Sequence, residues 1–347
     1  MQSVSQATRS GSYKYFGTSS LLLPRLGFGA APVGNLYTSI SDAEAGAAIE
    51  SALRLGIDYF DTAPHYGFGL SESRLGQHLP SRREQLVISS KVGRLLVPAT
   101  PTASLRHGFA NAPAFEPVFD YSYDAVMRSF ESSLQRLQTD HIDILFAHDL
   151  GITTHGQKHP RYFRSFMEGG YRAMHELRAA GVVTAIGLGA NEWQVCEQAL
   201  EQGDFDGFLL AGRYTLLDQS AAESFFPMCA RRKISVILGG PFNSGILASG
   251  VNRAGPFYYN YEPASQRIIQ RVAQLESICE EFAVPLAAAA LQFPAAHPQV
   301  CSVIAGLASP AQVEQAISWI NQVIPGEFWL RLRERDLLTP DALLPVN

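Results

Sequence analysis

Four side chains that can carry a proton follow three apolar runs of the chain. Asp61 and Tyr66 lie in FDTAPHYG, Lys91 lies in ISSKVG and His148 lies in LFAHD. Each apolar run is typical of a buried strand, so the polar residues fall at or just beyond the C-terminal ends of strands. In a parallel α/β barrel, those ends carry the catalytic groups. The four residues together predict a site that moves protons.

A proton relay at one oxygen is the chemistry that this set favours. A lysine ammonium beside a phenol is expected to lower the pKa of the tyrosine, and an aspartate would hold that lysine charged. A histidine could hydrogen-bond the substrate oxygen while a hydride leaves or joins the adjacent carbon. Singly, Asp61 could instead cap a turn, and Tyr66 or His148 could pack in a loop. Lys91 is harder to explain that way, because a buried lysine is costly unless it is paired.

Eight short apolar runs rich in β-forming residues recur along the chain. They show little alternation of apolar and polar residues, as expected of strands buried on both faces. The runs are residues 25–30, 57–63, 85–92, 142–149, 185–190, 205–212, 234–240 and 300–306. Helical patterns lie between them, several after a good capping residue such as Ser41, Ser122 or Ser309. The predicted helices are residues 42–56, 72–79, 123–138, 170–181, 192–202, 219–232, 264–283 and 308–320.

This alternation predicts an α/β fold, a (β/α)₈ TIM barrel. An open doubly wound sheet is the alternative, and eight strands without a break in composition favour closure. We expect a flexible tail at residues 1–12 and one domain at residues 13–347. The start of that domain could form a short hairpin beneath the barrel. Residues 95–122 form a loop long enough to cover a site at the C-terminal face.

Composition and charge limit the kinds of partner that we expect this chain to bind. The net charge of −5 gives no electrostatic reason to expect nucleic acid or an anionic membrane surface. We expect no secretory signal at the N-terminus and no membrane span, because no apolar run is long enough. Four scattered cysteines without CxxC spacing predict reduced thiols in a cytoplasmic protein. The histidines and cysteines form no recognisable metal-ligand set. The oligomeric state is left open.

Three segments carry a resemblance to a known family. They are GIDYFDTAPHYGFGLSESRLGQHL, VISSKVG and IDILFAHD, and they resemble the aldo-keto reductase family. The resemblance implies a barrel that binds a nicotinamide cofactor across its top without a Rossmann domain. It also implies that Tyr66 is the general acid/base, that Lys91 tunes it, that Asp61 pairs with Lys91, and that His148 orients the carbonyl oxygen.

A narrower resemblance, in PRLGFGAAPVGNLY, AGRYTLLDQ, GGPFNSGIL and VPLAAAALQFPAAHP, is to the branch that oxidises sugars. It implies oxidation of the anomeric carbon of an aldose of the L-fucose, L-galactose or D-arabinose type to its lactone. Oxidation of the pyridoxal hemiacetal to the lactone is an alternative, because the branch includes pyridoxal 4-dehydrogenases. The chemistry alone does not separate the two substrates.

The cofactor site departs from the family pattern in three places. The Ser-Asn pair reads Ala190-Asn191, the glutamine of the sixth strand is Ala211, and the stacking aromatic of the seventh falls at Gly239. Phe242 is a candidate substitute, and the GGPFNSGIL loop offers backbone amides to the pyrophosphate. The residues expected to bind the cofactor are Gly29, Ala30, Asp61, Asn191, Gly240, Pro241, Phe242, Ser244, Gly245, Gly306, Ser309 and Gln312.

The last loop bears on the choice of cofactor. Relatives that use NADP carry basic residues where this chain has Gly306 and Gln312. A 2′-phosphate would lack its charge-assisted bonds here, which predicts NAD over NADP. An arginine from elsewhere in the chain is the open alternative. NAD in turn favours oxidation as the working direction.

The substrate is expected to meet His65, Phe119 and Trp193. A histidine suits a polyhydroxylated sugar, and the two aromatic side chains could form apolar walls, although Trp193 could equally belong to the core. Three other functions stay open: an NADPH-dependent aldehyde reductase, an aldolase with Lys91 as its Schiff base, and a cofactor-sensing subunit without turnover. An aldolase lysine needs a desolvated or cation-crowded pocket, whereas Asp61 would hold Lys91 protonated.

Overall fold

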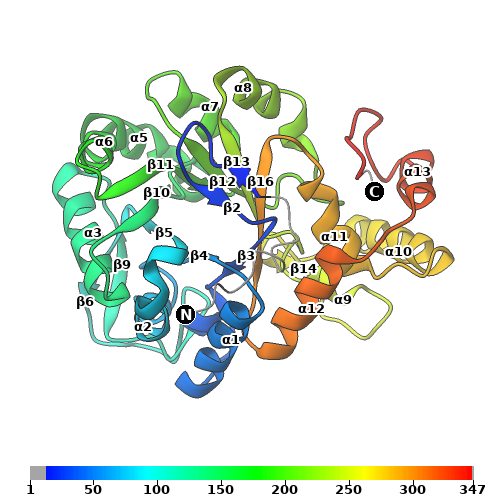
Figure 1. The fold of residues 1–347 in the computed structure, drawn as a ribbon, viewed down its shortest axis with the longest axis horizontal. Helices are drawn as coiled ribbons and strands as arrows, with labels where there is room; N and C mark the ends of the chain where they lie inside the picture. Colours follow the sequence, from blue (N-terminus) through cyan, green and yellow to red (C-terminus); the bar gives the residue numbers. More distant parts are fainter. Residues whose placement is uncertain (1–12, 346–347) are drawn as a thin grey trace, which may run out of the picture.

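The computed structural model describes residues 13–345, and its centre is a closed barrel of eight strands (Figure 1). Every pair of neighbouring strands is parallel, which confirms the predicted barrel over the open sheet. The tail predicted for residues 1–12 lies outside the described residues. In order around the barrel, the strands are β3 (Leu26–Gly29), β4 (Tyr59–Asp61), β5 (Val87–Val92), β10 (Ile142–His148), β11 (Val183–Ala190), β12 (Gly207–Ala211), β13 (Ser235–Gly239) and β16 (Val300–Gly306).

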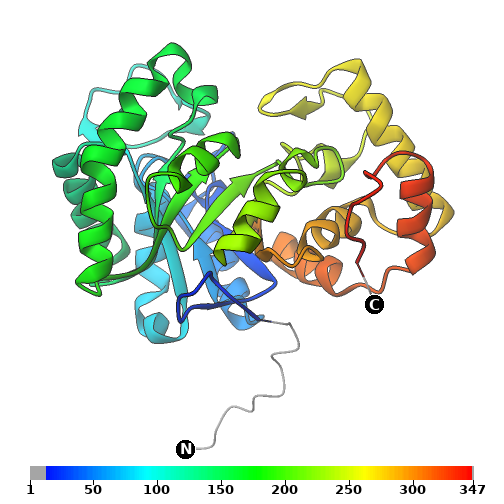
Figure 2. The same ribbon diagram turned by 90° about the horizontal axis from the view of Figure 1, so that it is seen from above.

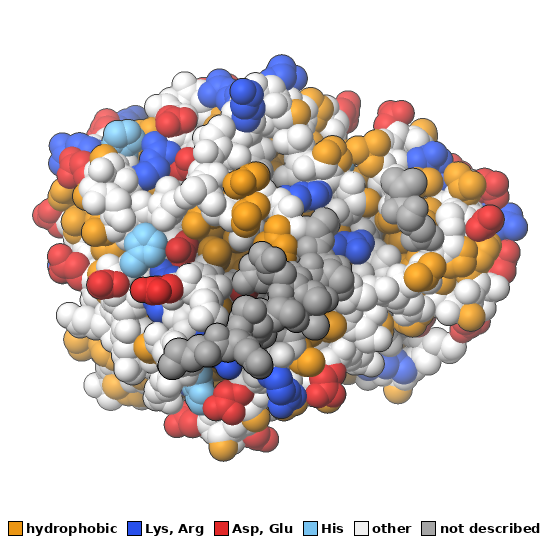
Figure 3. Space-filling view, in the orientation of Figure 1, with side chains coloured by type: hydrophobic (Ala, Val, Ile, Leu, Met, Phe, Trp, Pro, Cys, Tyr) orange, Lys and Arg blue, Asp and Glu red, His pale blue; other side chains and the backbone are white. Residues whose placement is uncertain are grey.

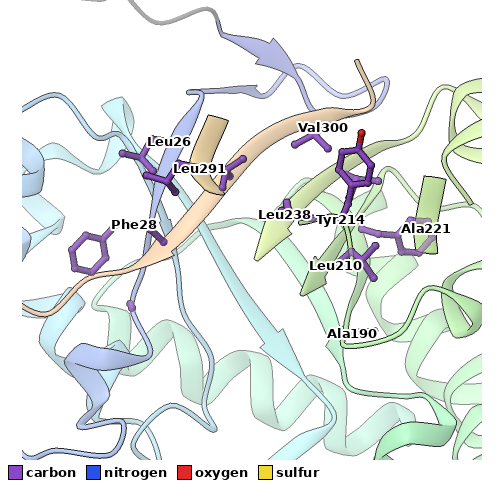
Figure 4. Close-up of a cluster of buried hydrophobic side chains, with 14 of the residues drawn as sticks. Leu26, Phe28, Ala190, Leu210, Tyr214, Ala221, Leu238, Leu291 and Val300 are labelled. Carbon is purple, nitrogen blue, oxygen red and sulfur yellow. The ribbon is translucent and has the colours of Figure 1, made fainter. Parts of the chain in front are cut away.

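Burial on both faces explains why the strands show little alternation in sequence. Successive side chains of a strand point to opposite faces. On β10, Ile144 and Phe146 point into the barrel, while Leu145 and Ala147 join the core beneath the helices. Figure 4 shows part of that outer core, with Leu26, Leu210 and Leu238 from three strands and Leu291 from a covering helix.

The covering helices begin where the capping residues predicted them. Ser41 caps its helix with a capping box, and Ser122 and Ser309 each accept a hydrogen bond from the first turn. The helices that follow strands around the barrel are α1 (Asp42–Arg54), α2 (Leu70–His78), α3 (Tyr123–Leu137), α6 (Tyr171–Ala179), α7 (Gln194–Leu200), α8 (Phe225–Arg232), α11 (Leu286–Ala295) and α12 (Pro310–Asn321).

The helix predicted at residues 264–283 is present, but the helix that follows it was missed. The pattern at residues 264–283 forms α10 (Gln266–Glu281), yet the helix that packs against β16 and α12 is α11. The sequence of α11, LAAAALQFPA, has no polar face because nearly all of it is buried. An all-apolar helix lacks the period of 3.6 residues on which the prediction depended. Helix α10 packs instead against α13 (Gly326–Glu334), at the edge of the molecule.

Additional elements mark the two ends of the barrel (Figure 2). The predicted N-terminal hairpin is present as β1 (Lys14–Tyr15) and β2 (Leu22–Leu23), and the buried Phe16 between them packs into the barrel interior at its lower end. At the upper end rise β6 (Arg94–Pro98) with β9 (Phe115–Phe119), and the hairpin of β14 (Tyr258–Tyr259) with β15 (Glu262–Pro263). The loop at residues 95–122 is therefore folded and stands at the end where the site was predicted.

Surface charge, helix character and the placement of metal-ligating residues bear on other kinds of site that the described residues could form. On the face drawn in Figure 3, Lys and Arg side chains lie interspersed with Asp and Glu side chains. Within residues 13–345, no helix combines the length and apolar character that crossing a membrane requires. The same residues contain no group of three or more His, Cys, Asp and Glu side chains suited to a metal ion. The four cysteines are free and buried.

Candidate active site

The two-residue period of the strands brings three of the predicted residues together. Tyr59 points into the barrel, so Asp61, two residues later, also points inward at the end of β4. The same parity places Lys91 on β5 and His148 on β10 at the inner face. All three side chains are buried, and the strands that carry them are neighbours.

Lys91 and Asp61 form the buried pair at the centre of the site. Lys91 Nζ donates to both carboxylate oxygens of Asp61, at 2.9 and 2.7 Å, and to the carbonyl of Thr62 at 2.8 Å. Ser89 Oγ donates a further bond of 2.7 Å to Asp61. Burial lowers the pKa of Lys91, and Asp61 acts in the opposite direction. With its three protons engaged, the lysine is poorly placed to attack a carbonyl, which argues against the aldolase alternative.

Tyr66 stands beside this pair in the turn after β4. Lys91 Nζ lies 4.6 Å from the centroid of the Tyr66 ring, and the ring of His148 meets it edge-on at 5.9 Å. Two glycines allow the turn to lie here. A Cβ on Gly67, whose φ is +64°, would lie 2.2 Å from the carbonyl oxygen of Gly34. The Tyr66 hydroxyl has no hydrogen-bond partner among residues 13–345, so it is available to a substrate.

The expectation that Lys91 lowers the pKa of Tyr66 was wrong for this structure. Burial, followed by the charges of Asp61 and Asp149, raises the pKa of Tyr66 well above 10.0. Lys91 is paired with Asp61, and its three hydrogen bonds go to Asp61 and the Thr62 carbonyl. The phenol is therefore protonated at neutral pH and is ready to act as an acid.

Two histidines line the space next to the Tyr66 ring. The rings of His65 and His148 lie 5.9 Å apart. Burial, with Arg94 as the next cause, lowers the pKa of His65 to about 2 and that of His148 well below 6.5. Both rings are neutral at physiological pH, so each presents one donor and one acceptor nitrogen. The structure places His65 in the site, as the substrate prediction requires.

The structure adds an ion pair that the sequence analysis missed. Arg94 pairs with Asp149 through Nη2, and its Nη1 lies 2.8 Å from His65 Nε2. The carboxylate of Asp149 also accepts a bond of 3.0 Å from Asn191. Position in the chain could have indicated both residues. Arg94 comes three residues after Lys91, and Asp149 directly follows His148.

The two aromatic residues predicted to contact the substrate differ in placement. Phe119, at the end of β9, has the Arg94 guanidinium 4.8 Å from its ring centroid and stands 6.3 Å from the ring of Tyr121. It therefore belongs to the wall of the site formed by the loop at residues 95–122. Trp193 packs against the outer core next to α7, which favours the core role that the sequence left open.

The residues expected to bind the cofactor lie along one side of the same end of the barrel. Gly29 and Gly306 end neighbouring strands, and the amide of Ala30 is bound to the carbonyl of Asp61 at 2.8 Å. Asn191 follows β11, and Arg213 donates to its carbonyl at 2.6 Å. The next two strands, β12 and β13, end at Ala211 and Gly239, where only a methyl group and a hydrogen atom are present.

The loop after β13 fits a pyrophosphate. Gly240, Asn243, Ser244 and Gly245 all have positive φ, between 44° and 92°. Such a run turns backbone amides into a concave surface that suits an anion. The amides of Phe242 and Ser244 have no hydrogen-bond partner among the described residues, so two N–H donors remain available. Pro241 is buried and precedes both residues at the start of the turn.

The loop after β16 has no basic side chain at Gly306 or Gln312, the two positions considered for a 2′-phosphate. Gly306 is exposed, and a Cβ there would lie 3.1 Å from Pro32. Gln312 takes part in capping α12. Its side-chain oxygen accepts from Ala308 N at 2.7 Å, and its backbone N–H donates to the Ser309 hydroxyl. An arginine in the loop after β13, Arg253, is bound to Ala254 and Ser249.

Comparisons with known proteins agree with this arrangement. A profile described as "Aldo/keto reductase family" matches residues 25–336. The chain belongs to the aldo/keto reductase family. It is therefore an oxidoreductase, and nicotinamide cofactors are those that the family uses.

Two curated relatives match over most of their length. The chain is 46% identical to a pyridoxal 4-dehydrogenase of Microbacterium luteolum over 333 residues, covering 93% of this chain and 97% of the relative. It is 37% identical to a D-threo-aldose 1-dehydrogenase of a Pseudomonas species over 326 residues, covering 92% and 96%. These names match the aldose dehydrogenase branch that the sequence resembled.

Solved structures give the same fold. An aldo-keto reductase from Bacillus halodurans in its holo form has a TM-score of 0.72 and 25% identity, covering 93% of this chain and 96% of its own. A glycerol dehydrogenase from Gluconobacter oxydans has a TM-score of 0.74 at 18% identity, and that likeness concerns the fold alone.

Proposed function

We propose that this chain uses NAD to oxidise the anomeric carbon of an aldose, of the L-fucose, L-galactose or D-arabinose type, to its lactone. The observation that carries the proposal is the uncommitted hydroxyl of Tyr66, whose ring lies against the Lys91 ammonium and next to the neutral ring of His148. The likeness to an aldose 1-dehydrogenase over 92% of the chain supports the substrate class.

Each residue of the site has a separate role at the anomeric carbon and its hydroxyl group. Bound NAD supplies the hydride acceptor. Once deprotonated, Tyr66 accepts the proton of the anomeric hydroxyl as the hydride leaves the anomeric carbon, which becomes the carbonyl carbon of the lactone. His148 donates a hydrogen bond to the same oxygen and so holds it toward Tyr66. Lys91 and Asp61 fix the floor beneath the ring.

Three features support NAD as the cofactor. Asn191 and the free amides of Phe242 and Ser244 would hold the nicotinamide and the pyrophosphate. Gly306 and Gln312 provide no charge for a 2′-phosphate, and the Gln312 side chain is already bound to Ala308. A dianionic phosphate without a cationic partner loses its charge-assisted hydrogen bonds.

The free, buried cysteines support a reducing compartment such as the cytoplasm.

A second candidate function is oxidation of the pyridoxal hemiacetal to its lactone. The identity of 46% with a pyridoxal 4-dehydrogenase keeps this candidate open. Both substrates present a cyclic hemiacetal carbon, so the same proton relay serves both. Reduction of aldehydes with NADPH is less well supported. It requires a positively charged site for the 2′-phosphate, and Gly306 and Gln312 carry no charge.

A substrate panel tests the proposal. Purified protein is incubated with L-fucose, L-galactose, D-arabinose or pyridoxal and with NAD or NADP, and the reduced nicotinamide is followed by its absorbance. Chromatography identifies the lactone. We expect turnover with NAD and at least one aldose. Turnover of pyridoxal alone would select the second candidate, and faster turnover with NADP would refute the assignment of the cofactor.

A further inference from the structure

We propose that Asp149 is a positioning residue that orients His148 and Asn191 at the same time, and so aligns the substrate oxygen with the cofactor. This inference rests on the proposed function for the identity of the two ligands. It is carried by the contacts of one buried carboxylate, which lies just beyond β10 and is 7% exposed.

The backbone holds the carboxylate in a fixed place. Asp149 has a φ of +51°, in the left-handed region that aspartate and asparagine tolerate better than most residues. Its amide donates to the carbonyl of Gly189 at 2.8 Å, and its carbonyl accepts from Tyr121 Oη at 3.2 Å. The side chain therefore projects from an anchored turn.

The first consequence concerns Asn191. Asp149 Oδ1 accepts a bond of 3.0 Å from Asn191 Nδ2. Because a carboxylate can only accept, the amide must turn its NH₂ group toward Asp149 and its oxygen away. That oxygen has no hydrogen-bond partner among residues 13–345, and an amide oxygen suits the NH₂ of a nicotinamide carboxamide. Arg213 holds the carbonyl of the same residue at 2.6 Å.

The second consequence concerns His148. Its Nε2 lies 3.5 Å from Asp149 Oδ2, whereas its Nδ1 is buried without a partner among the described residues. A nearby carboxylate favours the tautomer whose proton faces it, so the proton resides on Nε2. At 3.5 Å the bond to Asp149 is too long to engage that donor fully. The N–H remains available to a substrate oxygen.

Arg94 completes the arrangement from the other side. It pairs with Asp149 Oδ2 and places a second nitrogen 2.8 Å from His65 Nε2. Since a guanidinium can only donate, His65 Nε2 must accept. The side chains that face the substrate and the one that faces the cofactor are thus linked through a single carboxylate.

The Asp149→Asn substitution tests the inference without changing the size of the side chain. The single oxygen of the new amide cannot satisfy both Arg94 and Asn191. If it bonds to the guanidinium, it takes the place of Oδ2 and also faces His148, while its NH₂ group takes the place of Oδ1 and faces Asn191. The Asn191 amide would then rotate, and His148 Nε2 would face a neutral amide oxygen instead of a carboxylate, which weakens the preference of His148 for the Nε2–H tautomer.

Asp143→Asn is the matched control. Asp143 lies at the other end of β10, is also 7% exposed, and pairs with Arg83 at 2.7 Å. It also accepts from Ile88 N at 2.7 Å and lies 3.2 Å from His141. The control removes an equally buried and equally connected carboxylate, but far from the site.

Two measurements read out the effect in the full chain. The first is the Kd of NADH from a fluorescence titration, expected to rise about ten-fold in Asp149→Asn and to stay within about two-fold in Asp143→Asn. The second is the tautomer of His148, observed by NMR with ¹⁵N-labelled histidine and assigned with His148→Gln. We expect mainly the Nε2–H form in the wild type and a smaller share of it in Asp149→Asn only.

Wild-type NADH affinity together with an unchanged His148 tautomer in Asp149→Asn would overturn the inference. If that variant fails to fold by circular dichroism, Arg94→Gln replaces it. Loosening Asp149 in this way should weaken NADH binding, and unchanged binding would overturn the inference equally. Neither readout requires turnover, so a negative substrate panel would count against the proposed function alone.

Discussion

The ammonium of Lys91 lies 4.6 Å from the centroid of the Tyr66 ring, and its three hydrogen bonds go to Asp61 and the Thr62 carbonyl. The lysine thus neutralises a buried carboxylate and supports the face of the phenol, while the Tyr66 hydroxyl stays uncommitted. This relationship separates two roles, stability of the site floor and proton transfer, that mutations should affect differently.

Tyr66→Phe should remove proton transfer and little else. General acid–base groups contribute roughly 10²- to 10⁴-fold to rate, so kcat for the best substrate of the panel should fall by that order. The hydroxyl has no partner among residues 13–345, so its loss should leave the thermal unfolding midpoint unchanged. Wild-type NADH affinity confirms an intact site. Turnover at the wild-type rate would contradict the role assigned to Tyr66.

The rate of oxidation should rise with pH. Burial and the charges of Asp61 and Asp149 raise the pKa of Tyr66 well above 10.0, and oxidation requires the phenolate to accept a proton. His148 stays neutral at these pH values, because its pKa is well below 6.5. A plot of log kcat/KM between about pH 6 and about pH 10 should therefore climb without a plateau. A plateau near neutral pH would show that bound ligands lower the pKa of Tyr66, or that another base acts.

Lys91→Met should destabilise the fold as well as impair turnover. Removing one partner of a buried ion pair leaves an uncompensated charge, at a cost of about 3–5 kcal/mol. The side chains of Lys91 and Asp61 are both 2% exposed, so solvent does not relieve that charge. Urea unfolding monitored by circular dichroism measures the loss. The double variant Lys91→Met, Asp61→Asn should regain part of it, and a double variant less stable than Lys91→Met would argue against the pairing.

Gln312→Arg should shift the cofactor preference toward NADP. A guanidinium at the start of α12 could pair with a 2′-phosphate, and one charge-assisted bond is worth about 1.5–3 kcal/mol, or roughly ten-fold or more in kcat/KM. Gln312→Met serves as the control, because it loses the bond to Ala308 without gaining charge. The ratio of kcat/KM for NADP to that for NAD should increase only in the arginine variant. Gly306 is less suitable, since a Cβ there would lie 3.1 Å from Pro32.

The sequence by itself determined the architecture and the catalytic residues to be tested. Eight short apolar runs with little polar alternation favoured strands buried on both faces, and their number favoured closure. Asp61, Lys91 and His148 were identified because a polar residue at the end of such a run needs a reason to be there. Helix ends at Ser41, Ser122 and Ser309 were predictable, since capping is local.

The tertiary structure decided what depends on distant parts of the chain. Helix α11 was missed because its surroundings bury every face, which erases its periodicity. The direction of the Tyr66 pKa shift was wrong because it depends on burial and on where the Lys91 ammonium points. Asp149 gained importance only when the start of β6 and the ends of β10 and β11 brought Arg94, His148 and Asn191 to one carboxylate. A sequence states which groups exist, whereas the distances between them arise from packing the whole barrel.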